Sequence, residues 1–596
     1  MMSNRVEKYN HEKKSVDYNN LIFIFIIILG AFHQFNGTKG YQYLLYNEFY
    51  YFDAFKLSLL SNHNIINSNF FLPILKFLQI SLNNDFVSFA FYILFGLFSV
   101  YCLIKLLEEF FEVKDPYAVR IIVIPLLFTN HFLLDYLPAS IFIYHMNTAT
   151  SITTQLIYPL ALFTLRKSWS IYALISSIMI LTHFTVAWLP VFISSAYCLF
   201  INKKKLINCI WTLVPFLIFL NFFIFNNNFD VSYNYKDSLY LLRELFYRVG
   251  SEGILNEQPL LRIIILYVTF GLSLFYIKKI NSYDLKIYLL FLLTLSLTAV
   301  TIGTIWTWKL YIIYPKIQIG LLYFARAMAT YNMFFCLGLL LIILNSRLSL
   351  IVKFALICSI YVLGKTYFSI NGMIIASLII IFSFFINMAA PRLKINNLFK
   401  ERSETKIIFL FMVIFYLLSH LYFINKYRVP EFDLWQFNNL NKWTNGHLLS
   451  KSSETKNSFL SLRDCDDFNL LPLDIDKNNM IKLNYYINYL TYKSPIFIES
   501  SMLYGDIDAY KENKKNRDFA YQIINDLNNS LEAEDELKEF IISNKIHFLL
   551  PSFTENKKNY FSEMAPFSFN ISNEYILLSQ NKDIVTNLVS CANSKT

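Results

Sequence analysis

The sequence predicts a mainly α-helical protein: a polytopic membrane helical bundle followed by a small α/β domain. The chain of 596 residues is 55% hydrophobic and 16% charged, and its mean hydropathy is +0.41. This composition is too apolar for one soluble globule of that length. Residues 20–425 break into long apolar runs, several of which approach the ~20 residues that a helix needs to cross the hydrocarbon. Residues 426–596 are rich in Asn, Asp, Lys, Ser and Tyr, which indicates a separate domain.

The apolar runs predict about thirteen spans after a short amino-terminal segment, residues 1–19. Their centres fall near residues 28, 97, 126, 156, 177, 194, 216, 269, 295, 331, 358, 380 and 415. Two of these crossings must share the stretch from Trp169 to Asn202, so we expect a pair of short or re-entrant helices there. The first span has no small-residue cleavage site and is expected to remain as an anchor.

Basic residues at alternate joints predict the orientation of the spans. Those expected on one side are Arg5, Lys8, Lys13, Lys14, Lys105, Lys114, Arg166, Lys167, Lys203 to Lys205, Lys278, Lys279, Arg347, Lys353, Arg392, Lys394, Lys400, Arg402 and Lys406. By the positive-inside rule this side is cytoplasmic, and an odd number of spans then places residues 426–596 outside. The predicted location is a bacterial inner (plasma) membrane. Because the net charge of +10 is spread over these joints, we expect membrane lipids and no nucleic acid as partners.

The outer domain is expected to be α/β. The apolar runs SPIFIES (494–500), IHFLLPS (546–552) and EYILLSQ (574–580) predict strands, and the stretches FAYQIINDL and EAEDELKEFIIS predict helices between them. The same domain holds Cys465 and Cys591. These two residues would either form a disulfide or remain separate thiols.

The absence of several motifs narrows the chemistry. The chain has no CxxC, no HExxH and no close pair of histidines, so no metal site is predicted. It has no GxxxxGK[ST] and no GxGxxG, and it has only 14 glycines, so we predict no nucleotide site and no cofactor. If the protein transfers a group, the donor must be activated elsewhere and delivered in the membrane.

A wide aromatic loop, residues 35–85, follows the first span and carries Glu48 and Asp53 in YNEFYYFDAF. Carboxylates held just outside a span are candidates for chemistry at the membrane surface. Apolar residues between Leu57 and Leu75 predict that the loop folds back on the bilayer as short amphipathic helices. Such helices would hold both carboxylates near the headgroups.

Together these features resemble the GT-C superfamily of polyprenyl-phosphate-sugar-dependent membrane glycosyltransferases. The shared features are a long first external loop with early acidic residues, about thirteen spans and an extracytoplasmic carboxy-terminal α/β domain. The middle of the chain, which ends in Leu181-Thr182-His183, is also similar to uncharacterised bacterial GT-C-like proteins. The resemblance implies a polyprenyl-phosphate-linked sugar as donor and an extracytoplasmic glycan, lipid or protein as acceptor.

The implied reaction needs a base and a cation. In family members the catalytic carboxylate lies a short way after the first span, a position that both Glu48 and Asp53 satisfy. Neither belongs to a clear Asp-x-Asp or Glu-x-Asp pair, so the choice between them stays open. Arg326, near the outer end of a span, can bind a phosphate with two hydrogen bonds, and Lys309 and Lys316 could assist. The alternative for these three is snorkelling to the interface.

Three further residues have two interpretations each. His183 either contacts substrate or packs as a hydrogen-bonded residue in the membrane. Asp135 and His145, on the second external loop, either bind an acceptor sugar or hold the loop. Two other functions also remain open. An envelope polysaccharide flippase or polymerase-type protein needs polar groups along a route through the bilayer, and a non-catalytic membrane scaffold needs no such groups.

Overall fold

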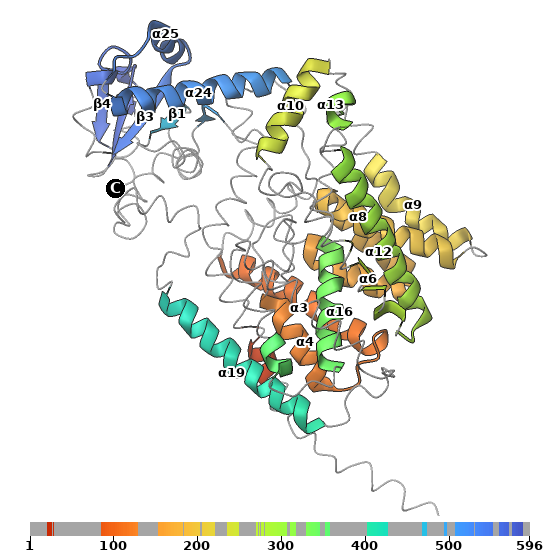
Figure 1. The fold of residues 1–596 in the computed structure, drawn as a ribbon. Coiled ribbons are helices and arrows are strands. Elements are labelled where there is room, and N and C mark those ends of the chain that lie inside the picture. The colour runs from red at the N-terminus through yellow and green to blue at the C-terminus, as the bar shows by residue number, and fades with distance from the viewer. Residues whose placement is uncertain are drawn as a thin grey trace, which may run out of the picture.

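The structure of the chain is a computed structural model, and it is mostly helical with one small sheet (Figure 1). It describes residues 21–26, 28, 85–128, 153–182, 184–202, 206–220, 235–248, 267, 270, 271, 273, 274, 276–278, 280–306, 310–316, 329–345, 352–357, 402–426, 468–473, 494–497, 507–529, 531–551, 559–570, 575–583 and 585–587. Within these ranges the helical class predicted from the sequence is confirmed.

The first part of the helical bundle folds back and forth on itself. Its helices are α3 (Asp85–Glu109), α4 (Pro116–Phe128), α6 (Ile157–Leu165), α7 (Trp169–Thr182), α8 (Phe184–Ile201) and α9 (Leu206–Leu220). Helix α3 packs against α6, and α7 packs against α9. The turn after α6 places Lys167 in the left-handed region at φ 59°, and the Ser168 amide donates to the Phe163 carbonyl at 3.0 Å. This turn ends α6 and reverses the chain into α7.

In the described part of the chain the bundle continues with α12 (Tyr283–Ile305), α16 (Ala329–Asn345) and α19 (Arg402–Lys426). Helix α12 packs against α8, and α19 packs against α4. Helix α12 begins at Ser282, whose hydroxyl accepts the Leu285 amide at 3.4 Å. The carboxylate of Asp284, in the first turn, stabilises the helix because it lies at the positive end of the helix dipole.

Polar groups inside the bundle are mostly hydroxyls. Tyr172 and Ser195 lie 2.7 Å apart, oxygen to oxygen, and Ser194 lies 3.4 Å from the Tyr288 hydroxyl. These pairs join α7 to α8 and α8 to α12, as hydroxyl contacts between packed membrane helices commonly do. The remaining core is apolar and extends over all the described bundle helices except α9, which packs against its edge.

For the stretch from Trp169 to Asn202 we predicted a pair of short or re-entrant helices, and the structure has two helices there. Helix α7 has 14 residues and α8 has 18 residues with Pro190 inside it. Two described helices, α8 and the Tyr283–Gly303 part of α12, are long and apolar enough to cross a membrane. Shorter apolar helices run through Trp169–Thr182 and Thr405–Phe415. These helices indicate membrane association.

The carboxy-terminal unit is a five-stranded sheet with two helices, in the order β2-β1-β3-β5-β4. Its elements are β1 (Asn469–Pro472), β2 (Ser494–Pro495), α24 (Ile507–Asn529), α25 (Asp535–Ser543), β3 (Ile546–Pro551), β4 (Phe567–Asn570) and β5 (Tyr575–Ser579). Strand β1 pairs in parallel with β2 and β3, whereas β5 pairs antiparallel with β3 and β4. The predicted α/β class of this segment is confirmed.

One face of the sheet packs against both helices of the unit. Phe548 and Leu550 of β3 share a buried cluster with Ile523 of α24 and Leu537 of α25. His547 points to the other face of β3 because successive side chains alternate. It is 1% exposed, and its ring lies 5.0 Å from that of Phe468. The sheet is therefore buried on both faces around β3.

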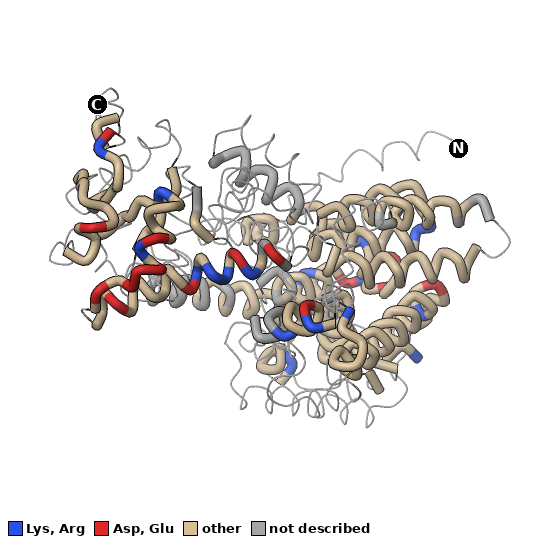
Figure 2. Tube along the Cα trace, turned by 90° about the horizontal axis from the view of Figure 1, so that it is seen from above, with Lys and Arg blue, Asp and Glu red and all other residues tan. Residues whose placement is uncertain are grey.

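Two short elements lie between the bundle and this unit: α10 (Tyr235–Arg248) and α13 (Tyr311–Ile313). Figure 1 shows α10 and α13 beside the end of α24, on the side of the bundle away from α4 and α19. Along most of their length the bundle helices are free of charged residues, whereas charges of both signs alternate along the carboxy-terminal helices (Figure 2).

Candidate functional site

Of the residues that the sequence nominates, only Lys316 belongs to the described part of the chain. Glu48, Asp53, Asp135, His145, His183, Lys309 and Arg326 lie outside the described residues. Cys465 and Cys591 lie outside them as well, so the choice between a disulfide and two thiols stays a prediction. The described cysteines Cys102 and Cys198 are buried thiols, and the Asn202 side-chain amide donates to Cys198 Sγ at 3.4 Å.

Lys316 is exposed directly after α13. Its amide donates to the Tyr314 carbonyl at 3.0 Å, and its Nζ lies 5.3 Å from the centre of the Tyr314 ring. Helix α13 is tied to α10 because the Tyr235 hydroxyl donates to the Ile312 carbonyl at 2.5 Å. Lys316 therefore stands on the same outer surface as α10.

Helix α10 in turn contacts α24 of the carboxy-terminal unit. The Lys511 ammonium donates to Asp237 at 3.0 Å, and the Lys514 ammonium donates to the Tyr240 hydroxyl at 2.9 Å. The Tyr240 and Tyr510 rings meet edge to face at 5.9 Å between centroids. The hydrogen bond to Asp237 raises the pKa of Lys511. We call the contact among α10, α13 and α24 the outer junction.

An open pocket of about 370 Å³ lies at the outer junction. Its lining comes from α10, α24 and α25 and consists of Tyr240, Lys511, Lys514, Lys515, Asp518, Phe519, Gln522 and Glu536. The sequence analysis missed this site. The spacing of three lysines in KENKKN, at i, i+3 and i+4, could have indicated a basic stripe on one helix face, but the aromatic partner Tyr240 is far away in sequence.

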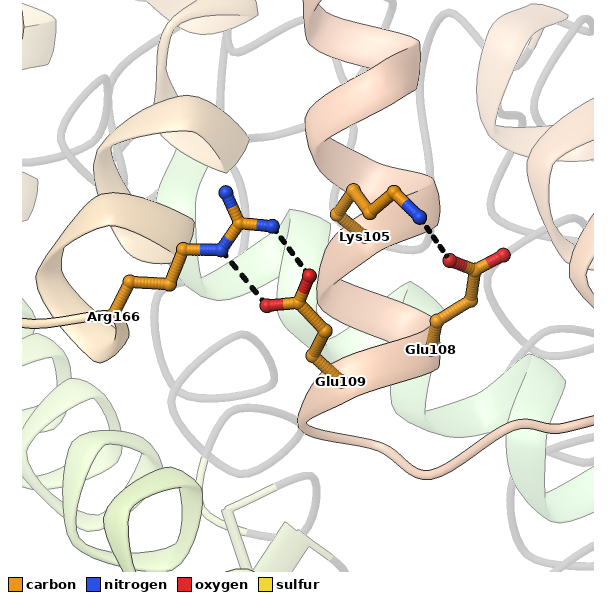
Figure 3. Close-up of polar contacts among 4 residues, drawn as sticks. All are labelled: Lys105, Glu108, Glu109 and Arg166. Carbon is orange, nitrogen blue, oxygen red and sulfur yellow. Dashed lines mark hydrogen bonds and ion pairs between the residues drawn. The ribbon is translucent and has the colours of Figure 1, made fainter.

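The opposite end of the bundle gathers a second set of charges (Figure 3). Nε of Arg166 donates to Glu109 at 2.8 Å, and a second guanidinium nitrogen donates to its other oxygen. Lys105 donates to Glu108 at 2.7 Å one turn along α3. We call this region the basic end, because it joins two of the basic joints identified in the sequence.

A third joint also meets the basic end. Lys167 pairs with Asp284, at the start of α12, at 2.8 Å. The Asn281 amide lies 3.5 Å from Glu112, after α3. The structure thus brings the joints near residues 105–112, 166–167 and 281–284 together.

The described residues offer no protein-built metal site. Within these ranges no group of three or more His, Cys, Asp or Glu side chains could hold an ion.

No protein-family model, no curated protein and no solved structure matches the chain.

Proposed function

We propose that the chain is a membrane glycosyltransferase of the GT-C type with about thirteen spans. It would transfer a sugar from a polyprenyl-phosphate donor to an extracytoplasmic glycan, lipid or protein acceptor. The observation that carries this proposal is the separation of the outer junction from the basic end by the length of one apolar helix, α12.

The dimensions of α12 fit a bilayer. Its 23 residues correspond to about 34 Å of helix, against a hydrocarbon core of roughly 30 Å. After Lys286 it has no charged residue up to Ile305. Its first turn belongs to the basic end, and its last turn leads to α13 at the outer junction. Charges at both ends and none between them support a membrane-crossing orientation.

The outer faces of the bundle helices also support a lipid environment. On α9, Ile210, Leu213 and Leu217 are 56%, 52% and 61% exposed. On α12, Ile302 is 54% exposed. Large apolar side chains exposed in such numbers would be unfavourable in water, whereas acyl chains solvate them without cost.

The reaction requires groups at the outer end. The acceptor hydroxyl forms a bond to the anomeric carbon, its proton passes to a carboxylate, and the bond between that carbon and the lipid phosphate breaks. Glu48 or Asp53 is the proposed base. Arg326, with Lys309 and Lys316, is proposed to neutralise the departing phosphate. The position of Lys316 at the outer junction supports this arrangement.

Site substitutions in a complementation assay test the proposal. Glu48→Gln, Asp53→Asn and Arg326→Lys proteins should be expressed at normal level in a deletion strain. One of the two carboxylate variants should abolish transfer, measured as the glycan and lipid-linked-sugar profile. Arg326→Lys should impair transfer strongly because the paired hydrogen-bond geometry is lost. Glu108→Gln, at the basic end, is the matched control and should complement fully. Full complementation by all three site variants would exclude this site and favour a scaffold or flippase.

Reporter fusions test the proposed topology. A reporter fused after Asn425 should be active only outside the cytoplasm, and one fused after Lys205 only inside it. Cytoplasmic activity after Asn425 would refute the thirteen-span arrangement.

A further inference from the structure

We propose that the pocket at the outer junction binds an acidic saccharide, a sugar chain that carries carboxylate groups. This site lies apart from the residues proposed for transfer. The role of the bound saccharide as the acceptor rests on the proposed function. Its binding depends only on the residues that line the pocket.

The size and openness of the pocket suit a short segment of a longer chain. A volume of about 370 Å³ falls at the lower end of small-molecule sites. The pocket is open rather than enclosed, so a ligand can extend beyond it. An enclosed cavity would instead select a small, detached molecule.

Aromatic rings form the apolar part of the lining. Tyr240 is half-buried, and the Lys514 ammonium lies 5.2 Å from the centre of its ring. Phe519 is 9% exposed and packs against Phe540 at 4.4 Å between ring centroids. The Lys515 ammonium lies 5.2 Å from the Phe519 ring. Because Phe519 is buried, the half-buried Tyr240 ring is the aromatic surface that can meet the C–H groups of a pyranose ring, with the Lys514 ammonium beside it.

Three ammonium groups give the pocket its preference for negative charge. Lys511, Lys514 and Lys515 occupy one side of α24 because residues three and four apart are neighbours on a helix. The Lys515 side chain is 60% exposed and only 3.7 Å from Glu536, itself 75% exposed. An exposed pair of this kind contributes little to stability. A ligand carboxylate can therefore replace Glu536 beside Lys515.

The remaining lining distinguishes a saccharide from a bare anion. Asp518, Glu536 and Gln522 add carboxylate and amide oxygens within the same pocket. These oxygens accept hydrogen bonds from hydroxyl groups, and a saccharide offers many more hydroxyl groups than inorganic phosphate or a nucleic-acid backbone does. A ligand that has many hydroxyls and a few carboxylates satisfies both kinds of group.

Binding to the full-length protein in lipid nanodiscs tests this inference. Trigalacturonic acid is the acidic probe and maltotriose the neutral probe, titrated by isothermal calorimetry. We expect trigalacturonic acid to bind and maltotriose to bind at least tenfold more weakly. Lys515→Glu should weaken acidic binding at least tenfold, and Lys514→Ala should do likewise. Lys582→Ala, an exposed lysine near the end of the sheet, is the control and should change affinity less than twofold.

Three results would overturn the inference. These are no detectable binding of trigalacturonic acid at millimolar concentration, equal binding of maltotriose, or unchanged affinity in both lysine variants. Lys515 is 60% exposed, so we expect its variant to fold. If Glu48→Gln, Asp53→Asn and Arg326→Lys all complement while trigalacturonic acid still binds, only the proposed transfer activity fails.

Discussion

Acidification should loosen the carboxy-terminal sheet through His547. This side chain is 1% exposed in β3, and neither ring nitrogen has a hydrogen-bond partner among the described residues. Burial lowers the pKa of His547 from its ordinary 6.5 to about 4. The unfolded chain therefore binds a proton at a higher pH than the folded sheet does. The stability that comes from the neutral ring is fully present above pH 6.5 and is lost progressively as the pH falls from 6.5 to 4.

The size of the effect follows from linkage. With these two pKa values, the free energy of unfolding should fall by about 2 kcal/mol between pH 7.5 and pH 5. That corresponds to roughly a 30-fold rise in the open population of the sheet. Below pH 4 the full loss approaches ~3 kcal/mol. His547→Leu, which has no titrating group, should remove this dependence.

Hydrogen exchange with mass spectrometry measures this opening in the intact protein. Peptides covering Ile546–Pro551 should lose protection about 30-fold by pH 5 after correction for chemical exchange. Peptides from Ile157–Leu165 and Trp169–Thr182 contain no His, Asp or Glu and serve as the internal control. Unchanged protection of β3 in the wild type, or an equal loss in His547→Leu, would refute the assignment to this ring.

Three further predictions concern stability. Arg166→Ala should cost about 1 kcal/mol because it breaks a two-pronged pair, whereas Lys105→Ala should cost less than half of that, measured as thermal midpoints in nanodiscs. Gly338→Ala should be stabilising by up to ~1 kcal/mol, because an added Cβ meets the Tyr276 ring only at 3.4 Å; Gly338→Leu should destabilise, and tolerance of leucine would contradict the packing. Asp526→Asn should stabilise the sheet unit at pH 7, because burial raises the pKa of this carboxyl and its charge is disfavoured; the gain should shrink as the pH falls through that raised pKa, and a constant gain would refute the cause.

Sequence patterns identified the parts of the sheet that have strong local signals. The run IHFLLPS became β3 because it is apolar and bounded by polar residues. Strand β1 was missed because NLLP has only four residues and ends in proline. Strand β4 was missed because FSFN is short and contains only two apolar residues, and its side chains alternate between half-buried and exposed. Short strands form through their partners, and pairing is not visible in one local window.

The candidate site was harder to predict for a related reason. The charges of α24 indicate a solvated helix face when they are considered alone. They become a pocket only because Tyr240, 274 residues from Lys514, lies against them. The basic joints, in contrast, were visible because each follows an apolar run directly. The sequence thus predicted where charged ends fall along the chain, but it did not predict which distant aromatic residue meets them.

The contact between α10 and α24 sets an order of events during synthesis. Asp237 and Lys511 are 274 residues apart, so at ~5–20 residues per second α10 waits roughly 14–55 s for its partner. During that interval α10 lacks the hydrogen bonds that Lys511 donates to Asp237 and Lys514 donates to the Tyr240 hydroxyl. The contact between the two helices therefore forms only after the last part of the chain has been made.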